Sequence, residues 1–123
     1  MILVDTSVWI DHWRTGDERL MRLLEAGQVL VHPFVVGELS LGNLLHRRQV
    51  LTALQDLPQA TMATHTEMLG FIDHATLAGS GIGYIDAHLL AAVRLTPASQ
   101  LWSRDKRLSA VAVRLGLAYV AAH

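Results

Sequence analysis

The sequence predicts an α/β fold, a three-layer α/β/α sandwich around a mostly parallel central sheet. Short apolar runs of strand length alternate with longer segments of helical periodicity along the chain. The first run, "ILVD" at residues 2–5, has the continuous apolar pattern of a buried parallel strand. With 123 residues and 51% hydrophobic residues, the chain is expected to form a single domain over residues 1–123.

The helices that follow the first strand are predicted from their caps. Thr6 or Ser7 is expected to cap a helix through "VWIDHW". "DERLMRLLEAG" predicts a second helix, which Asp17 caps and Gly27 ends. "QVLVH" predicts the second strand. "PFVVGELSLGNLL" begins with Pro33, a favoured residue of the first helical turn, and predicts a further helix.

The second half continues the alternation. "RRQVLTALQDL" is expected to be helical up to the residue before Pro58, "ATMAT" is a weak strand, and residues 66–78 form a helix. The glycine-rich "GSGIG" leads into the helix of "IGYIDAHLLAAV". A strand "QLWS", a helix "DKRLSAVAVRLG" and a final strand "LAYVAA" complete the predicted fold.

Composition indicates the cellular location expected for the protein. No run approaches the roughly 20 apolar residues that a membrane span needs. The N-terminus lacks the basic lead of a signal peptide, and the chain has no cysteine. We therefore expect a cytoplasmic protein that contacts no membrane, although the sequence alone does not exclude secretion. The positive mean hydropathy indicates a surface that a partner covers, whereas the net charge of −1 gives no overall basic signal for nucleic acid.

Four acidic residues stand where solvation does not explain them. Asp5 ends the first predicted strand and Asp105 follows "QLWS" by two residues, so both are expected at the carboxyl edge of the sheet. Glu38 lies three residues from both Val35 and Leu41, on an apolar stripe. Asp86 shares a helix face with the apolar positions Leu89, Leu90 and Val93.

Each acid also has a purely structural interpretation. Asp5 and Asp105 are possible helix caps, and Glu38 and Asp86 are possible partners of Arg47 or Arg94 in buried ion pairs. Four converging carboxylates without cations would repel one another. A hard divalent ion that prefers oxygen ligands, Mg²⁺ or Mn²⁺, is the simplest compensation.

Other chemistries lack their motifs. No two of the seven histidines are three or four residues apart, so a helical zinc pair is absent from the sequence. "GSGIGY" has Tyr84 in place of the last glycine of a dinucleotide-binding loop. The sequence contains neither a Walker-type phosphate loop nor a "GxSxG" nucleophile elbow.

Four segments together resemble the PIN domain, and in particular the VapC-type toxins of bacterial toxin–antitoxin pairs. They are "ILVDTSVWID", "VVGEL", "GYIDAHLLAA" and "LWSRDKRL", in the order and spacing of that family. The resemblance implies a Mg²⁺- or Mn²⁺-dependent endoribonuclease. It also implies a VapB-type antitoxin as partner, which inserts a C-terminal segment into the groove of the toxin, and a homodimer.

The resemblance assigns the site residues. The acidic quartet of the family falls on Asp5, Glu38, Asp86 and Asp105, which would bind the metal directly or through its waters. The supporting hydroxyl after the first acid falls on Thr6 or Ser7. Ser103 stands where the family usually has threonine, a departure that preserves the hydroxyl.

Two further sets of residues are candidates for binding surfaces. Arg104, Lys106 and Arg107 lie beside the predicted site and are possible contacts for RNA phosphates, the alternative being a solvated helix start. An apolar groove for an antitoxin helix is predicted from residues that alternatively belong to the core. These residues are Trp9, Trp13, Leu20, Leu23 and Leu24 on one side, and Leu41, Leu44 and Leu45 on the other.

Three rival interpretations remain. A receiver domain would have adjacent acids after the first strand and a lysine ending a late strand, but Lys106, the one lysine, lies in a predicted helix start. A haloacid-dehalogenase-like phosphatase would have "DxD" where this chain has "DTS". A PIN-like binding module without catalytic activity is the third, and the presence of all four acids argues against it.

Overall fold

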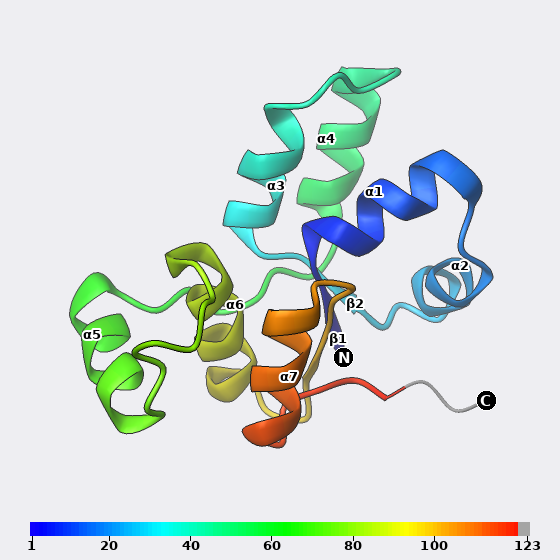
Figure 1. Ribbon diagram of the computed structural model, residues 1–123. Coiled ribbons are helices and arrows are strands. Elements are labelled where there is room, and N and C mark those ends of the chain that lie inside the picture. Colours follow the sequence, from blue (N-terminus) through cyan, green and yellow to red (C-terminus); the bar gives the residue numbers. More distant parts are fainter. Residues whose placement is uncertain (121–123) are drawn as a thin grey trace.

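Seven helices and three short strands make up the part of the chain that the structure describes, residues 1–120 of a computed structural model (Figure 1). In chain order they are β1 Ile2–Val4, α1 Thr6–Thr15, α2 Glu18–Glu25, β2 Val29–Leu30, α3 Pro33–Ser40, α4 Arg47–Asp56, α5 His65–His74, α6 Tyr84–Leu95, β3 Gln100–Trp102 and α7 Lys106–Arg114.

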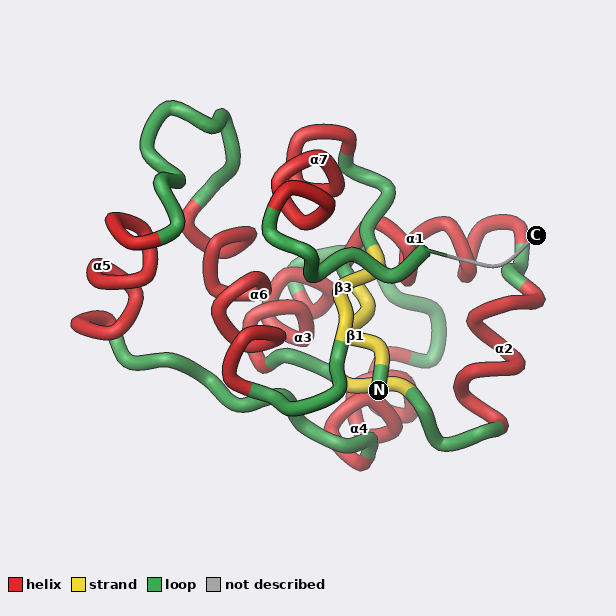
Figure 2. Tube along the Cα trace, turned by 90° about the horizontal axis from the view of Figure 1, so that it is seen from below, coloured by secondary structure: helices red, strands yellow, loops and turns green. Residues whose placement is uncertain are grey.

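The sheet is parallel and has the order β2-β1-β3. Ile2 of the central strand lies opposite Val29 on one side and Gln100 on the other. All three residues of β1 are buried, because helices cover both faces of the sheet. In both views α5 and α6 lie to one side of the strands and α1 and α2 to the other (Figures 1 and 2). The predicted α/β fold with helices on both sides of a parallel sheet is confirmed.

Helix α6 is the most deeply buried helix. Every residue from Ala87 to Val93 is buried, and three of these seven are alanines. Small side chains let neighbouring elements approach a helix from several directions, which is how one helix is covered all round. Because α6 is fixed in this way, its first turn, which carries Asp86, has a defined position above the sheet.

Two expected strands are not strands. In residues 60–64 the backbone contact is a hydrogen bond from the N–H of Ala60 to the carbonyl of Val31, 2.9 Å, beside an isolated bridge at Gln59. Near the C-terminus, Ala118 forms an isolated bridge to Leu101, and residues 121 and 122 of the expected strand lie outside the described residues. Both segments are apolar enough to pack, but too short to extend the sheet.

The helix expected over residues 33–45 ends early. α3 ends at Ser40, and a turn follows until α4 begins at Arg47. Leu41 is 89% exposed and Leu45 is 81% exposed in this turn. His46, immediately before α4, has the left-handed φ of 54°, which breaks helical continuity between the two elements.

Side-chain caps begin several helices, as the sequence predicts in part. Asp17 accepts a hydrogen bond from the N–H of Leu20 and caps α2, as expected. The expected cap of α1 at Thr6 or Ser7 is wrong, because Asp5 is the cap. Helix α5 begins one residue before the expected start, behind a reciprocal capping box between Thr64 and Glu67, and ends at His74 rather than Ala78.

His32 is an uncharged residue of the core. Its side chain is fully buried, and Nδ1 accepts a hydrogen bond from the N–H of Phe34, 3.0 Å, at the start of α3. The ring therefore carries its proton on Nε2, which has no hydrogen-bond partner among residues 1–120. Burial, with a smaller contribution from His88, lowers the pKa of His32 to about 4.

This pKa predicts that the free energy of unfolding depends on pH through His32. Below pH about 6.5 His32 becomes protonated in the unfolded chain but stays neutral in the native protein. The free energy of unfolding therefore falls as the pH decreases from about 6.5 to about 4. The full effect is about 3 kcal/mol. His32→Asn keeps an acceptor for the N–H of Phe34 but does not titrate. Urea unfolding at several pH values is expected to show a steeper loss in the wild type than in the variant, and parallel curves would contradict the assignment.

Candidate functional site

The four predicted acids come from four helices that begin near one edge of the sheet. Asp5 and Asp105 follow β1 and β3 and cap α1 and α7, with the Asp105 carboxylate accepting from the N–H of Leu108 at 2.9 Å. Asp86 lies in the first turn of α6, and its carboxylate accepts from the N–H of Gly83 at 3.1 Å. Glu38 lies near the end of α3.

Asp5 is held by two serine hydroxyls. It is only 6% exposed. Its Oδ2 atom accepts hydrogen bonds from Ser7 Oγ at 2.6 Å and from Ser103 Oγ at 2.9 Å. Ser7 Oγ in turn accepts from the N–H of Arg104, and Ser103 Oγ accepts from the N–H of Asp105, both at 3.0 Å. The network joins the ends of β1 and β3, and it orients Asp5 through one oxygen only.

The charges of two other acids affect the pKa of Asp86. Partial burial raises the pKa of Asp86, the N–H of Gly83 lowers it, and the charges of Asp5 and Asp105 raise it. Because the charges of both residues raise this pKa, the three carboxylates, which come from separate elements, lie close enough to repel one another. Among residues 1–120 none of the three forms an ion pair with lysine or arginine.

The periodicity predicts that Glu38 lies on a buried apolar stripe, but the structure shows that Glu38 is exposed. Its Oε1 atom accepts a hydrogen bond from Thr6 Oγ1 at 2.9 Å, which places it beside the residue that follows Asp5. The alternative ion pairs are not formed. Arg47 donates to the carbonyl of Gly42 at 3.4 Å, and the guanidinium of Arg94 lies 5.9 Å from the centre of the Phe71 ring.

The donor set suits a hard cation, but the carboxylates are turned to protein partners. Carboxylate and hydroxyl oxygens without thiolate or imidazole are the groups that Mg²⁺ and Mn²⁺ prefer. Within residues 1–120, however, no three histidine or acidic side chains are arranged as they stand to hold a metal ion. The residue types fit such an ion, and the present side-chain orientations satisfy backbone and hydroxyl donors instead.

The basic residues at the start of α7 differ in their surroundings. Arg104 donates to Asp11 Oδ2 at 2.9 Å and to Asp17 Oδ2, and its guanidinium lies 6.0 Å from the centre of a Trp102 ring. Its guanidinium therefore joins α1 to the start of α2. Nothing in the sequence indicates this long-range contact of Arg104 with Asp11 and Asp17. Lys106 is exposed.

An apolar groove of about 700 Å³ lies between α1 and the α3–α4 turn. Trp13, Leu44 and Leu45, three of the predicted groove residues, line it, and so does Glu38. Trp9 and Leu20 belong to the buried core. The other lining residues, which the sequence did not reveal, come from α1, from α3 and α4 and from the turn between α3 and α4: Ile10, Arg14, Leu39, Gly42, Asn43, His46 and Val50.

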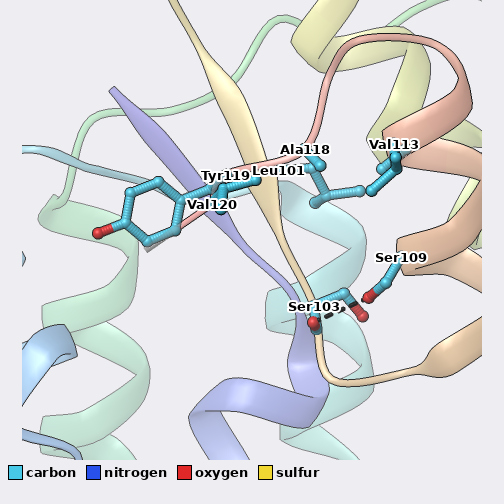
Figure 3. Close-up of a pocket in the computed structure, with 8 residues that line it drawn as sticks. Leu101, Ser103, Ser109, Val113, Ala118, Tyr119 and Val120 are labelled. Carbon is cyan, nitrogen blue, oxygen red and sulfur yellow. Dashed lines mark hydrogen bonds between the residues drawn. The ribbon is translucent and has the colours of Figure 1, made fainter. Parts of the chain in front are cut away.

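A second, smaller pocket of about 270 Å³ lies between β3, α7 and the C-terminal segment (Figure 3). Figure 3 shows Ser103 and Ser109 at one end of it and Val113 with Ala118 at the other. Ser109 Oγ donates to the carbonyl of Ser103 at 3.0 Å, which steadies the loop that carries the hydroxyl bonded to Asp5. The sequence gave no signal for Ser109, because its role depends on a contact with that loop.

Comparison with known proteins decides the family. The family model described as the PIN domain matches residues 2–114, from β1 through α7. The chain belongs to the PIN domain family. It is also 46% identical over 118 residues to Ribonuclease VapC32 of Mycobacterium tuberculosis, in strains CDC 1551 / Oshkosh and ATCC 25618 / H37Rv, covering 96% of this chain and 95% of the relative.

The matched span contains all four acids and both serines of the Asp5 network. The resemblance to VapC-type PIN domains that the four sequence segments carry is confirmed. No helix in the described part of the chain has the length and apolar character needed to cross a membrane.

Proposed function

We propose that this chain is a Mg²⁺- or Mn²⁺-dependent endoribonuclease, acting as the toxin of a toxin–antitoxin pair and forming one domain over residues 1–123. The observation that carries the proposal is the convergence of Asp5, Asp86 and Asp105 at one sheet edge, without a cationic partner in the described residues. The name of the VapC32 relative, a ribonuclease, supports RNA as the substrate.

The proposed site assigns a role to each group. Asp5, Asp86 and Asp105 bind the cation directly or through its waters, with Glu38 at the rim. When bound, the cation supplies an activated water and positive charge for the phosphate and the leaving oxygen. Ser7 and Ser103 keep Asp5 oriented through Oδ2, while Oδ1 has no hydrogen-bond partner among residues 1–120. Partial burial and the charges of Asp5 and Asp105 raise the pKa of Asp86, which favours its protonated form.

A PIN-like binding module without catalytic activity is the second candidate. The observation that favours it is the orientation of the carboxylates toward protein donors. Against it stands the cost of keeping three like charges together, which a protein without use for a cation could remove by one substitution. Cleavage by purified protein separates the two functions.

The proposed antitoxin partner fits the groove between α1 and the α3–α4 turn. Ile10 is 41% exposed, Trp13 38% and Leu45 81%, so the lining presents large apolar side chains to solvent. An amphipathic segment would bury these surfaces. Glu38 lines the same groove, which brings such a segment next to the acidic site. The proposed homodimer rests on the family resemblance alone.

The first prediction from the proposed function concerns RNA cleavage. Purified protein is expected to cut RNA with Mg²⁺ or Mn²⁺ and to stop when EDTA is added. Asp5→Asn is expected to lose at least about 100-fold in rate, since even partners of metal ligands contribute 10- to 100-fold. Asp73→Asn on α5 is the matched control, because it removes one charge with the same isosteric change. Full activity in Asp5→Asn would remove Asp5 from the mechanism.

The second prediction tests metal binding without reference to activity. Mg²⁺ is expected to raise the melting temperature of the wild type, because a ligand of the native state stabilises it by about 2.7 kcal/mol at 100 times its Kd. Asp86→Asn is expected to show a much smaller rise. Differential scanning calorimetry across millimolar Mg²⁺ measures both, and an equal response of the two proteins would argue against a cation at the acids.

The third prediction concerns the groove. Leu45→Asp is expected to weaken binding of a VapB-type antitoxin at least about tenfold, because it places a charge where an apolar surface must dehydrate. The melting temperature is expected to change little, since Leu45 is exposed. Leu69→Asp, at a site on α5 that is 52% exposed, is the control. Calorimetric titration compares the variants, and equal affinities would place the antitoxin elsewhere.

A further inference from the structure

The loop before α6 lies against the first turn of α7 at a single glycine. Gly81 has a left-handed φ of +84°. A Cβ atom placed on it would lie 3.2 Å from Arg107 Cδ, 3.4 Å from Nη1 and 3.5 Å from Nε. The arginine side chain therefore runs directly over the glycine. A side chain at this position would both strain the backbone and displace the guanidinium.

This contact joins the two segments that carry Asp105 and Asp86. Arg107 follows Asp105 by two residues on α7. Gly81 precedes Gly83 by two residues, and the N–H of Gly83 donates to Asp86. The guanidinium is thus positioned by the two segments that carry Asp105 and Asp86, and no ion pair with either acid is formed in the described structure.

Arg107, unlike Arg104 and Arg114, has no protein acceptor in the described residues. Arg104 is paired with Asp11 and Asp17, and Arg114 donates to the carbonyls of Ala75 and Thr76. Over residues 1–120, Arg107 has neither a hydrogen bond nor an ion pair, and it is exposed. Its donors are consequently available to a ligand.

The negative charge of an acidic site opposes the binding of a phosphodiester, which is also negatively charged. The same carboxylates that attract a cation repel the backbone of the substrate. A guanidinium at the rim offsets this repulsion and binds phosphate oxygens through two parallel hydrogen bonds. Lys106 carries the same charge one residue earlier, but the contact with the glycine loop belongs to Arg107.

We propose that Arg107 is the side chain that binds the RNA backbone phosphate at this site, and that Gly81 is a positioning residue because it leaves room for the guanidinium. The inference rests on the proposed ribonuclease function and names the residue that contacts its substrate.

Salt dependence of RNA binding tests the proposal apart from cleavage. The probe is a fluorescein-labelled single-stranded oligoribonucleotide of mixed sequence, titrated in EDTA. Arg107→Gln is expected to raise Kd at least about fivefold, and to reduce the slope of log affinity against log salt by about 0.7, the value of one phosphate contact. Arg22→Gln is the matched control, since it removes the same charge from α2, far from the glycine loop in both views.

Gly81→Ala separates a role through Arg107 from a general loss of structure. The variant is expected to raise Kd in the wild-type background, and to have no further effect on Kd when combined with Arg107→Gln. Backbone strain, which the melting temperature reports, is expected in both backgrounds. An additive effect on Kd would overturn the role assigned to Gly81.

The outcomes distinguish this inference from the proposed function. Weaker binding in Arg107→Gln but not in Arg22→Gln supports the inference, whether or not the protein cleaves. An equal loss in both variants, or no loss in Arg107→Gln, overturns it even if cleavage is observed. Absence of RNA binding by the wild type in EDTA overturns the inference, whereas the cleavage experiment with Mg²⁺ or Mn²⁺ decides the proposed function.

Discussion

The fold around the candidate site depends on how one buried carboxylate is satisfied. Asp5 is almost inaccessible to solvent, so its charge requires donors from the protein. Its Oδ2 atom takes hydroxyl donors from α1 and from the residue after β3. Its backbone N–H donates to the carbonyl of Trp102 at 2.9 Å. These bonds fasten the carboxyl ends of β1 and β3 together, and the loop that carries Asp105 is fixed to the same point.

Helix N-termini explain why three acids tolerate one another. Asp5 and Asp105 are N-caps, and Asp86 occupies the first turn of its helix. The unpaired N–H groups and the dipole at such ends favour negative charge, by about 0.3–1 kcal/mol for an exposed group. Repulsion and desolvation still raise the pKa of Asp86, so the helix ends offset the conflict without removing it. Glu38 lies away from the start of its helix and is exposed, as is Asp105.

The sequence predicts most of this arrangement because its signals are local. Apolar runs located the three strands, and caps such as Asp17 located helix starts. Glu38 was misplaced because periodicity reveals a stripe but not what the stripe packs against. Leu41, which was expected on the same stripe as Glu38, lies beyond the end of α3 and is exposed. The segments at residues 60–64 and 117–120 were misread as strands because their length and register depend on partners elsewhere in the fold.

Long-range polar contacts were the least predictable feature. Nothing in the local sequence around Arg104 indicates that its guanidinium reaches Asp11 and Asp17, 93 and 87 residues away. The pair matters for the site because the backbone N–H of Arg104 donates to Ser7, which donates to Asp5. One residue therefore connects the turn between α1 and α2 to the acidic edge.

Glu38 borders both the groove and the acidic site, and this determines how binding in the groove can affect the site. Glu38 lines the groove, and its carboxylate also accepts from Thr6, the residue after Asp5. A chain segment lying in the groove would contact one face of Glu38, while the hydrogen bond to Thr6 lies on the side toward Asp5. A basic group brought by that segment would compete with Thr6 for the carboxylate. The exposure of Glu38, which the sequence did not predict, is thus what makes the rim of the site accessible from the groove.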